Sequence, residues 1–200
     1  MKISQRGIFY LKCFIHLCAL ATFIRLAYLV DQDLLGADPI KEMIHFLGKA
    51  SLNFLLLTLL VTPVIKHFKQ PLLIRIRRLL GLYSFAWLCL HILTFVWLDL
   101  NCKLMLFIDE VVERPYLSLG AIAWVILLLL SITSVNFIKR KMRSHWLTLH
   151  RFVYWAVLFA TIHYYWSVKS GLIEPSIYLL VTVYLLAERK HYFLSLFKSR

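Results

Sequence analysis

Six apolar stretches, each close to the length needed to cross a lipid bilayer, constrain the fold of this chain more than any other feature. A transmembrane helix needs roughly 20 mainly apolar residues, because the hydrocarbon core is about 30 Å thick and a helix rises about 1.5 Å per residue. Lipid offers the backbone no hydrogen-bond partners, so long apolar runs cross it as helices. The sequence therefore predicts an all-α membrane protein, a bundle of six transmembrane helices. The predicted spans are residues 8–30, 44–65, 79–98, 116–137, 147–167 and 172–187.

The overall composition agrees with this class and excludes others. Of the 200 residues, 61% are hydrophobic and only 16% are charged, which is far from the balance of a soluble domain. No polar block between the spans is long enough to fold by itself, so residues 1–200 are expected to form a single domain. The net charge of +13 is no sign of nucleic-acid binding, because the basic residues gather in a few loops between apolar runs.

The loops alternate in charge along the chain. Lysine and arginine dominate residues 66–78 and 139–143, whereas acidic residues dominate 31–42 and 99–113. Cytoplasmic loops of membrane proteins carry the excess of lysine and arginine. Both termini and the two basic loops are therefore predicted to be cytoplasmic, and the two acidic loops are predicted to face outward.

Two histidines inside apolar spans are the strongest candidates for a functional site. Ionisable side chains are costly within a membrane and usually mark function. His91 lies roughly 18 Å from the cytoplasmic edge of its predicted span, and His163 lies roughly 24 Å from that edge in its own span. At such similar depths on two helices, the two imidazoles could share one haem iron. The alternative is that each histidine forms a hydrogen bond with a neighbouring helix.

Three further histidines are weaker candidates. His150 lies near the cytoplasmic start of the predicted fifth span, about 20 Å along that helix from His163, so it cannot join the same pair. It is a candidate for a second haem or for electron uptake, and the alternative is an ordinary hydrogen bond at the helix start. In one continuous helix, His150 and His163 would point in opposite directions. His45 at the start of the second span and His16 within the first are lower-ranked candidates.

Other cofactor motifs are absent from the sequence. The four cysteines form neither a CxxC nor a CxxCH pattern, so any haem must be bound without covalent attachment. There is no GxGxxG pattern, so the chain has no dinucleotide-binding domain of its own. Electrons would have to arrive from another protein or from quinol.

Six motifs, in a fixed order and spacing along nearly the whole chain, carry a family resemblance. They are LGADPIK at 35–41, KQPLLIRIRRLLGL at 69–82, His91 in its apolar setting, ERPYLSLG at 113–120, LHRFVY at 149–154 and IHYYWSVK at 162–169. With these motifs the chain resembles the MsrQ (formerly YedZ) family, the haem-binding membrane subunits of bacterial MsrPQ methionine-sulfoxide reductase systems. That family lies within the ferric-reductase-like transmembrane group, which also includes the NADPH oxidases.

The resemblance implies several properties of this chain. It implies haem b, an FMN and a multi-pass location in the bacterial inner membrane. It also implies electron delivery to a periplasmic molybdenum-cofactor reductase, MsrP, from a cytoplasmic flavin reductase or the quinone pool, so the chain would be a non-catalytic subunit with no catalytic residue of its own. The oxidase relatives carry two histidines on each of two helices. Here His150 and His163 lie on one span, whereas His91 has Arg77 rather than a histidine about fourteen residues earlier, which leaves a second haem open.

FMN carries a phosphate, and arginines at the start of a helix on the cytoplasmic face form the best candidate anion site. The candidates are Arg75, Arg77 and Arg78, and the alternative is that their charge serves only to orient the chain. Three classes of function remain at this point: a transmembrane electron conduit, a quinol-oxidising cytochrome b subunit of another reductase, and a transporter with a histidine proton relay.

Overall fold

The computed structural model describes residues 3–168, 170–190 and 193, and this part of the chain contains helices and no strand. The predicted C-terminal tail, residues 191–200, lies outside the described residues apart from Phe193, as does Lys169 of the last motif. The long helices are α1 (Gln5–Asp31), α2 (Pro39–Phe68), α3 (Arg77–Thr94), α5 (Pro115–Ile132), α8 (Val153–Ser167) and α9 (Ile173–Ala187). The short elements are η1 (Pro71–Ile76), the π-helical η2 (Phe95–Asp99), α4 (Leu104–Glu113), α6 (Asn136–Met142) and α7 (Ser144–His150).

The structure confirms an all-helical, multi-pass membrane protein. Four segments are long and apolar enough to cross a bilayer: residues 5–31, 39–68, 71–99 and 115–132. The helices α8 and α9 have 15 residues each, which corresponds to only about 22 Å of helix. The count of six crossings therefore stays a prediction.

The helix of the predicted fourth span ends earlier than the sequence suggests. The helix α5 stops at Ile132 rather than at residue 137, and α6 starts at Asn136. The Thr133 hydroxyl donates to the carbonyl of Leu129, and Val135 adopts an extended conformation. Threonine competes in this way with the backbone hydrogen bonds of a helix, which favours the break.

The predicted fifth span is also not one continuous helix. Its first part is the short helix α7, and a tight turn at Arg151 and Phe152 separates α7 from α8. In this turn the amides of both residues donate to carbonyls three positions earlier, which is the tighter 3₁₀ pattern. His150 therefore ends α7 and does not belong to the helix that carries His163. The opposed directions expected from one ideal helix do not apply.

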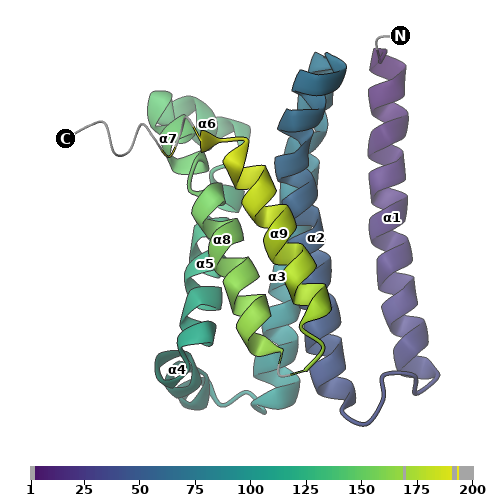
Figure 1. Cartoon of the computed structure of the whole chain (residues 1–200), viewed down its shortest axis with the longest axis vertical. Coiled ribbons are helices and arrows are strands. Elements are labelled where there is room, and N and C mark those ends of the chain that lie inside the picture. Colours follow the sequence, from purple (N-terminus) through teal and green to yellow (C-terminus); the bar gives the residue numbers. More distant parts are fainter. Residues whose placement is uncertain (1–2, 169, 191–192, 194–200) are drawn as a thin grey trace.

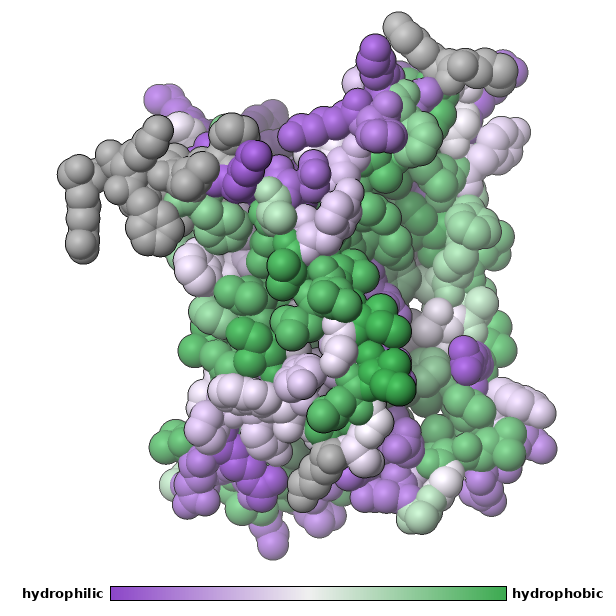
Figure 2. All heavy atoms as spheres, viewed as in Figure 1, coloured by the Kyte–Doolittle hydropathy of each residue, from purple (hydrophilic) through white to green (hydrophobic). Residues whose placement is uncertain are grey.

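The helix ends group by loop charge (Figure 1). The start of α1, the turn from α2 to α3, the helices α6 and α7, and the end of α9 lie at one end of the bundle. We call this the basic end, because it holds the basic loops 66–78 and 139–143. The helix α4 and the turns from α1 to α2 and from α8 to α9 lie at the opposite, acidic end. Figure 2 shows hydrophilic residues at both ends and a mainly apolar band between them, the pattern of a membrane protein.

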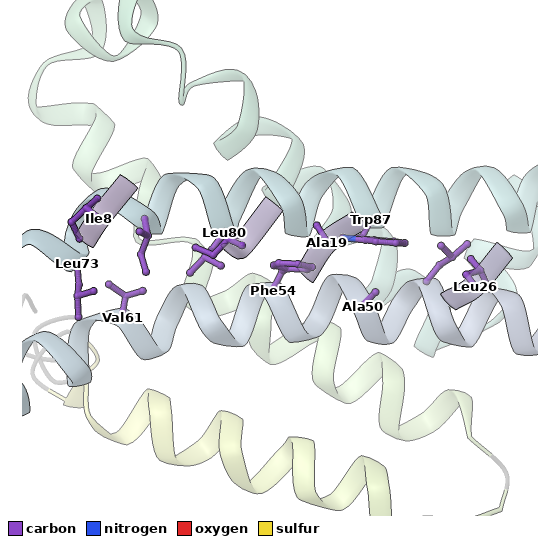
Figure 3. Close-up of a cluster of buried hydrophobic side chains, with 12 residues drawn as sticks. Ile8, Ala19, Leu26, Ala50, Phe54, Val61, Leu73, Leu80 and Trp87 are labelled. Atoms are coloured by element: carbon purple, nitrogen blue, oxygen red, sulfur yellow. The ribbon is translucent and has the colours of Figure 1, made fainter. Parts of the chain in front are cut away.

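Two hydrophobic clusters meet at α2. The first joins α1, α2, η1 and α3, as Figure 3 shows for side chains such as Ile8, Phe54 and Trp87. The second joins α2, α5, α8 and α9. Between α2 and α3, the Ser51 and Ser84 hydroxyls each donate to the other residue's carbonyl, at 2.9 and 3.0 Å. Small polar residues of this kind allow helices in lipid to approach closely. The α2–α3 and α5–α8 pairs thus form the frame that positions the histidines.

Candidate functional site

The structure brings His91 and His163 together. His91 lies near the end of α3 and His163 near the end of α8, toward the acidic end of the bundle. Their ring centroids are 6.3 Å apart, and the ring planes are inclined by 81°. The two histidines, which were paired by their predicted depth alone, thus lie close together in the fold, although they are 72 positions apart in the sequence.

A backbone carbonyl fixes the orientation of each ring. His91 Nδ1 lies 2.9 Å from the carbonyl oxygen of Ile44 on α2, and His163 Nδ1 lies 2.7 Å from that of Tyr116 on α5. A carbonyl can only accept, so each Nδ1 must carry the hydrogen and donate it. The lone pair of each neutral imidazole is then on Nε2. This is the usual arrangement of metal-ligating histidines, whose second nitrogen is held by an outer partner.

Two glycines make room for these rings. A Cβ atom on Gly48 would lie 3.1 Å from His91 Nδ1, and a Cβ atom on Gly120 would lie 2.9 Å from His163 Nδ1. Real Cβ atoms essentially never approach as closely as the second value. Any side chain at Gly120 would push against a ring that the Tyr116 carbonyl already holds. Position 120 therefore requires glycine if the His163 ring is to keep its hydrogen bond, whereas a side chain at position 48 would displace the His91 ring by a few tenths of an ångström.

The two half-sites are related by a constant offset in the sequence. Each half consists of a residue whose backbone carbonyl accepts the hydrogen bond, a glycine four residues later and a histidine on the following long helix. The first set is Ile44, Gly48 and His91, and the second set is Tyr116, Gly120 and His163. Each residue of the second set lies 72 positions after its counterpart in the first set. Of these three residues, the glycine and the histidine are identical in the two halves, whereas isoleucine in the first half corresponds to tyrosine in the second. The structure shows that the site is built from two equivalent helix pairs.

The spacing of the two rings fits a single metal ion between them. An imidazole nitrogen binds a metal ion at about 2 Å, and the ring centre lies about 1 Å further from the metal, so two axial imidazoles have centroids about 6 Å apart. The observed value is 6.3 Å. Among the described residues, no group of three or more His, Cys, Asp or Glu side chains could hold an ion. A donor set of two imidazoles suits an iron whose other four ligands come from a porphyrin.

His45 lies one turn before Gly48 on α2 and interacts electrostatically with both rings of the pair. Nearby, Lys49 Nζ forms an ion pair with Glu174 on α9 at 3.2 Å. His45 thus belongs to the surroundings of the histidine pair, and no hydrogen bond ties it to either ring. His16 lies elsewhere: its Nδ1 is 2.5 Å from the hydroxyl of Tyr83, at the contact between α1 and α3.

His150 has a different environment at the basic end. Its Nε2 lies 3.2 Å from the Thr133 hydroxyl, and its ring stacks on Trp146 with centroids 3.9 Å apart. The Trp146 indole donates to the Thr133 carbonyl at 2.9 Å, and the Lys139 ammonium lies 4.4 Å from the Trp146 ring centre. The offset of 72 residues pairs His150 with Arg78, one position after the Arg77 considered in the sequence. The acidic end thus has two histidines, at positions 91 and 163, whereas the positions compared at the basic end, 78 and 150, hold one histidine and one arginine.

The three candidate arginines do not converge on one point. Arg75 donates to the Gln5 side chain on α1, and Arg78 donates to Asn136 at the start of α6, at 3.2 Å. Arg77 acts electrostatically on both His150 and Arg189. Arg189 was not among the residues selected from the sequence; it is buried after α9 and donates to the carbonyls of Leu59 and Leu185. The sequence also did not point to Gly48 and Gly120, although their equal distance from the two histidines was a usable signal.

The fold and the site together define a multi-pass helical membrane protein with two carbonyl-bonded histidines close together. The model of the ferric reductase like transmembrane component family matches residues 47–161, more than half of the chain, and the chain belongs to this family. The matched region contains Gly48, His91, Gly120 and His150 and ends two residues before His163. Members of the family commonly bind haem, and the domain indicates electron transfer in the membrane. No solved structure matches the chain.

Proposed function

We propose that this protein is an MsrQ-type subunit of the bacterial inner membrane that conducts electrons across it through one haem b. Its donor would be a cytoplasmic flavin reductase or the quinone pool, with FMN as an intermediate carrier. Its acceptor would be a periplasmic molybdenum-cofactor reductase of the MsrP type, which repairs oxidised methionine in periplasmic proteins. The motifs shared with the MsrQ family and the membership in the ferric-reductase-like family support this proposal.

The observation that carries the proposal is the geometry of His91 and His163. Both rings present Nε2 as the free nitrogen, and their 6.3 Å separation suits two axial ligands of one iron. A proton relay between the same histidines would need a direct or water-mediated path. The carbonyl bonds instead fix each Nδ1 proton in place, which suits permanent ligation better than proton transfer.

The haem iron would supply one-electron oxidation and reduction. This chain's own residues would hold it: His91 and His163 as axial ligands, and the Ile44 and Tyr116 carbonyls as partners that keep both tautomers fixed. Hydrogen bonds of this kind make the ligating nitrogen more electron-rich. The apolar helices around the pair exclude water, which preserves both the ligation and the hydrogen bonds.

We place electron uptake at the basic end, near His150. The FMN phosphate needs cationic or N–H groups, and this end offers a pocket of about 390 Å³ lined by Asn136, Lys139, Arg140 and Arg143. Arg78 reaches the rim of the pocket through its bond to Asn136. Of the three arginines selected from the sequence, Arg78 therefore has the best-supported link to a flavin phosphate. With a histidine at only one of the two equivalent positions, we propose no second bis-histidine haem here.

The test is the reduced-minus-oxidised absorbance spectrum of purified His91→Ala and His163→Ala variants. Each substitution removes one axial nitrogen, so both variants should lose the low-spin haem b bands. His67→Ala is the matched control, because His67 is an exposed histidine at the end of α2. A full bis-histidine spectrum in either site variant at wild-type protein yield would refute the assignment. A wild-type protein with no haem spectrum would instead favour the transporter.

The donor and the acceptor need a separate test. Purified protein would be mixed with NADPH and a cytoplasmic flavin reductase, or with a quinol, and haem reduction would be followed by stopped flow. A periplasmic methionine-sulfoxide reductase with molybdenum cofactor would then be added to the reduced protein. Re-oxidation of the haem with conversion of methionine sulfoxide supports the proposed acceptor, and a haem that stays reduced contradicts it.

A further inference from the structure

A second polar pocket, separate from the histidine pair, lies where α1 meets η1 and the start of α3. It has a volume of about 280 Å³, and it is located at the basic end of the bundle. Its lining residues are Lys12, His16, Arg75, Arg78, Leu79 and Leu82. One wall is thus apolar, and the rest of the lining is cationic or imidazole.

Among the residues that the structure describes, no carboxylate forms an ion pair with the cations of this pocket. Arg75 donates to Gln5, and Arg78 donates to Asn136, so both guanidinium groups meet neutral amide oxygens. The two ion pairs found in the described part of the chain, Lys49 with Glu174 and Arg114 with Glu110, lie elsewhere. Three cations that converge without an acid repel one another unless an anion joins them.

In the proposed topology the pocket lies just below the cytoplasmic surface, within reach of lipid headgroups. Lys12 is seven residues after the start of α1, which corresponds to about 10 Å along the helix, and His16 is one turn deeper. Around them, Phe9, Phe14 and Leu17 of α1 are exposed, as expected for residues that contact acyl chains. A ligand in the pocket could therefore keep its polar part among the cations and its apolar part along α1 and the Leu79–Leu82 wall.

A hydrogen-bonded pair closes the deeper end. His16 Nδ1 is 2.5 Å from the Tyr83 hydroxyl, and the Tyr83 ring stacks on Phe54 of α2 with centroids 5.4 Å apart. The pair leaves the second ring nitrogen of His16, which lines the pocket, available to a ligand oxygen. A phosphate diester in this pocket would lie among Lys12, Arg75, Arg78 and His16, all of which line it.

We propose that this pocket binds the phosphate of an anionic phospholipid from the adjacent leaflet, with phosphatidylglycerol as the simplest example. Basic pockets between transmembrane helices on the cytoplasmic side recognise such headgroups. The lipid would join α1 to α3 by charge, at a helix that buries only four of its 27 residues. A quinone could also arrive from the bilayer, but its neutral ring gives no reason for three convergent cations. The assignment of this lipid to the cytoplasmic leaflet rests on the proposed topology. Binding of the phosphate by the pocket does not depend on whether the protein holds a haem.

The test is native mass spectrometry of the full-length protein released from nanodiscs that contain phosphatidylglycerol and phosphatidylcholine in equal amounts. The test variant is Lys12→Gln/Arg75→Gln. The control is Lys66→Gln/Lys69→Gln, which removes the same charge from exposed positions at the same end outside the pocket. Wild type and control should each retain one phosphatidylglycerol. The test variant should need roughly tenfold more of this lipid for the same occupancy. Circular dichroism verifies that all three proteins are equally helical.

Several outcomes would overturn the proposal. Equal retention of phosphatidylglycerol by the test variant, or an equal loss in the control, would show that the pocket is not the site. Retention of phosphatidylcholine to the same degree would remove the role of the anionic headgroup. Ubiquinone bound in place of the lipid would identify a quinone site. Displacement of the lipid by millimolar FMN or inorganic phosphate would show that the site takes a free phosphate. Loss of the haem spectrum in the wild type would leave this proposal intact and refute only the proposed function.

Discussion

The acidic and basic ends of this bundle use equivalent positions of two related helix pairs in different ways. At the acidic end, His91 and His163 are 6.3 Å apart, and each donates Nδ1–H to a carbonyl of a neighbouring helix. At the basic end, the equivalent positions hold Arg78 and His150, and His150 Nε2 lies against the Thr133 hydroxyl. At the acidic end, Nε2 of both histidines is thus left free by the hydrogen bonds at Nδ1. At the basic end, Nε2 of His150 is in contact with a hydroxyl.

A histidine in an apolar segment is a candidate ligand when its hydrogen-bond partner leaves one ring nitrogen free to bind a metal, as the carbonyls leave Nε2 of His91 and His163. Both types of histidine lie in similar sequence surroundings, with leucine or tyrosine nearby. What differs is the group that meets the ring: a carbonyl at Nδ1 for the pair, and a hydroxyl at Nε2 for His150.

The basic and acidic ends should face opposite sides of the membrane, and reporter fusions should give opposite scores for them. Reporter fusions after residues 66–78, after residues 139–143 and at the C-terminus should all score as cytoplasmic. Fusions within residues 31–42 and 99–113 should score as periplasmic. The alternating loop charge is the reason, and the shared end of the basic segments in the fold supports it. A periplasmic score at the C-terminus would contradict the count of six crossings and reverse the assignment of the two ends.

A large loss of haem is expected from Gly120→Ala. The new Cβ would lie 2.9 Å from His163 Nδ1 and force the ring away from the Tyr116 carbonyl, so haem content per protein should fall several-fold. Gly48→Ala should lose less, because its Cβ would lie 3.1 Å from His91. Gly81→Ala is the control, since its nearest neighbour would be 3.9 Å away. A pyridine haemochrome assay measures all three, and wild-type haem content in Gly120→Ala would refute the role of the glycine.

An effect on rate alone is expected from His150→Ala. The variant should keep the haem spectrum of the wild type, because His150 is not one of the two ligands, yet its haem should be reduced more slowly by the cytoplasmic flavin donor. Re-oxidation by the periplasmic reductase should be unchanged. Stopped-flow measurement of the two half-reactions decides the role of His150. Loss of haem in this variant would break the contrast between the two ends, and an unaffected reduction step would remove the uptake role.

The smallest effect is expected from Thr133→Val, which removes the hydroxyl that meets His150 while keeping the side-chain shape. The same hydroxyl donates to the Leu129 carbonyl, so the variant should lower the free energy of unfolding by about 2 kcal/mol, the usual net value of two hydrogen bonds. It should leave the haem content unchanged. Thermal unfolding followed by circular dichroism measures the change. A loss above about 3 kcal/mol would show that Thr133 supports more than a local contact.

Much of the fold followed from the sequence, because long apolar runs leave the backbone few choices in lipid. The positions of the first three predicted spans and the pairing of His91 with His163 required only hydropathy and helix rise. The helix ends at Ile132 and at Arg151 did not follow, because they depend on a threonine hydroxyl and a tight turn that hydropathy ignores. The roles of Ile44 and Tyr116 were also out of reach, since a carbonyl contact has no residue signature. For Gly48 and Gly120, the only signal in the sequence was that each lies the same number of residues before its histidine.

The central claim is that His91 and His163 ligate one iron with nearly perpendicular imidazole planes. Low-temperature electron paramagnetic resonance of the oxidised, purified wild-type protein tests it most directly. At the 81° between the rings, the two iron orbitals that overlap with the imidazoles stay nearly equal in energy, which makes the g values strongly anisotropic. We expect one low-spin ferric signal of this highly anisotropic type, accounting for one haem per chain. A rhombic low-spin signal of parallel imidazoles, a high-spin signal of a haem with a single histidine, or two low-spin signals would contradict the account.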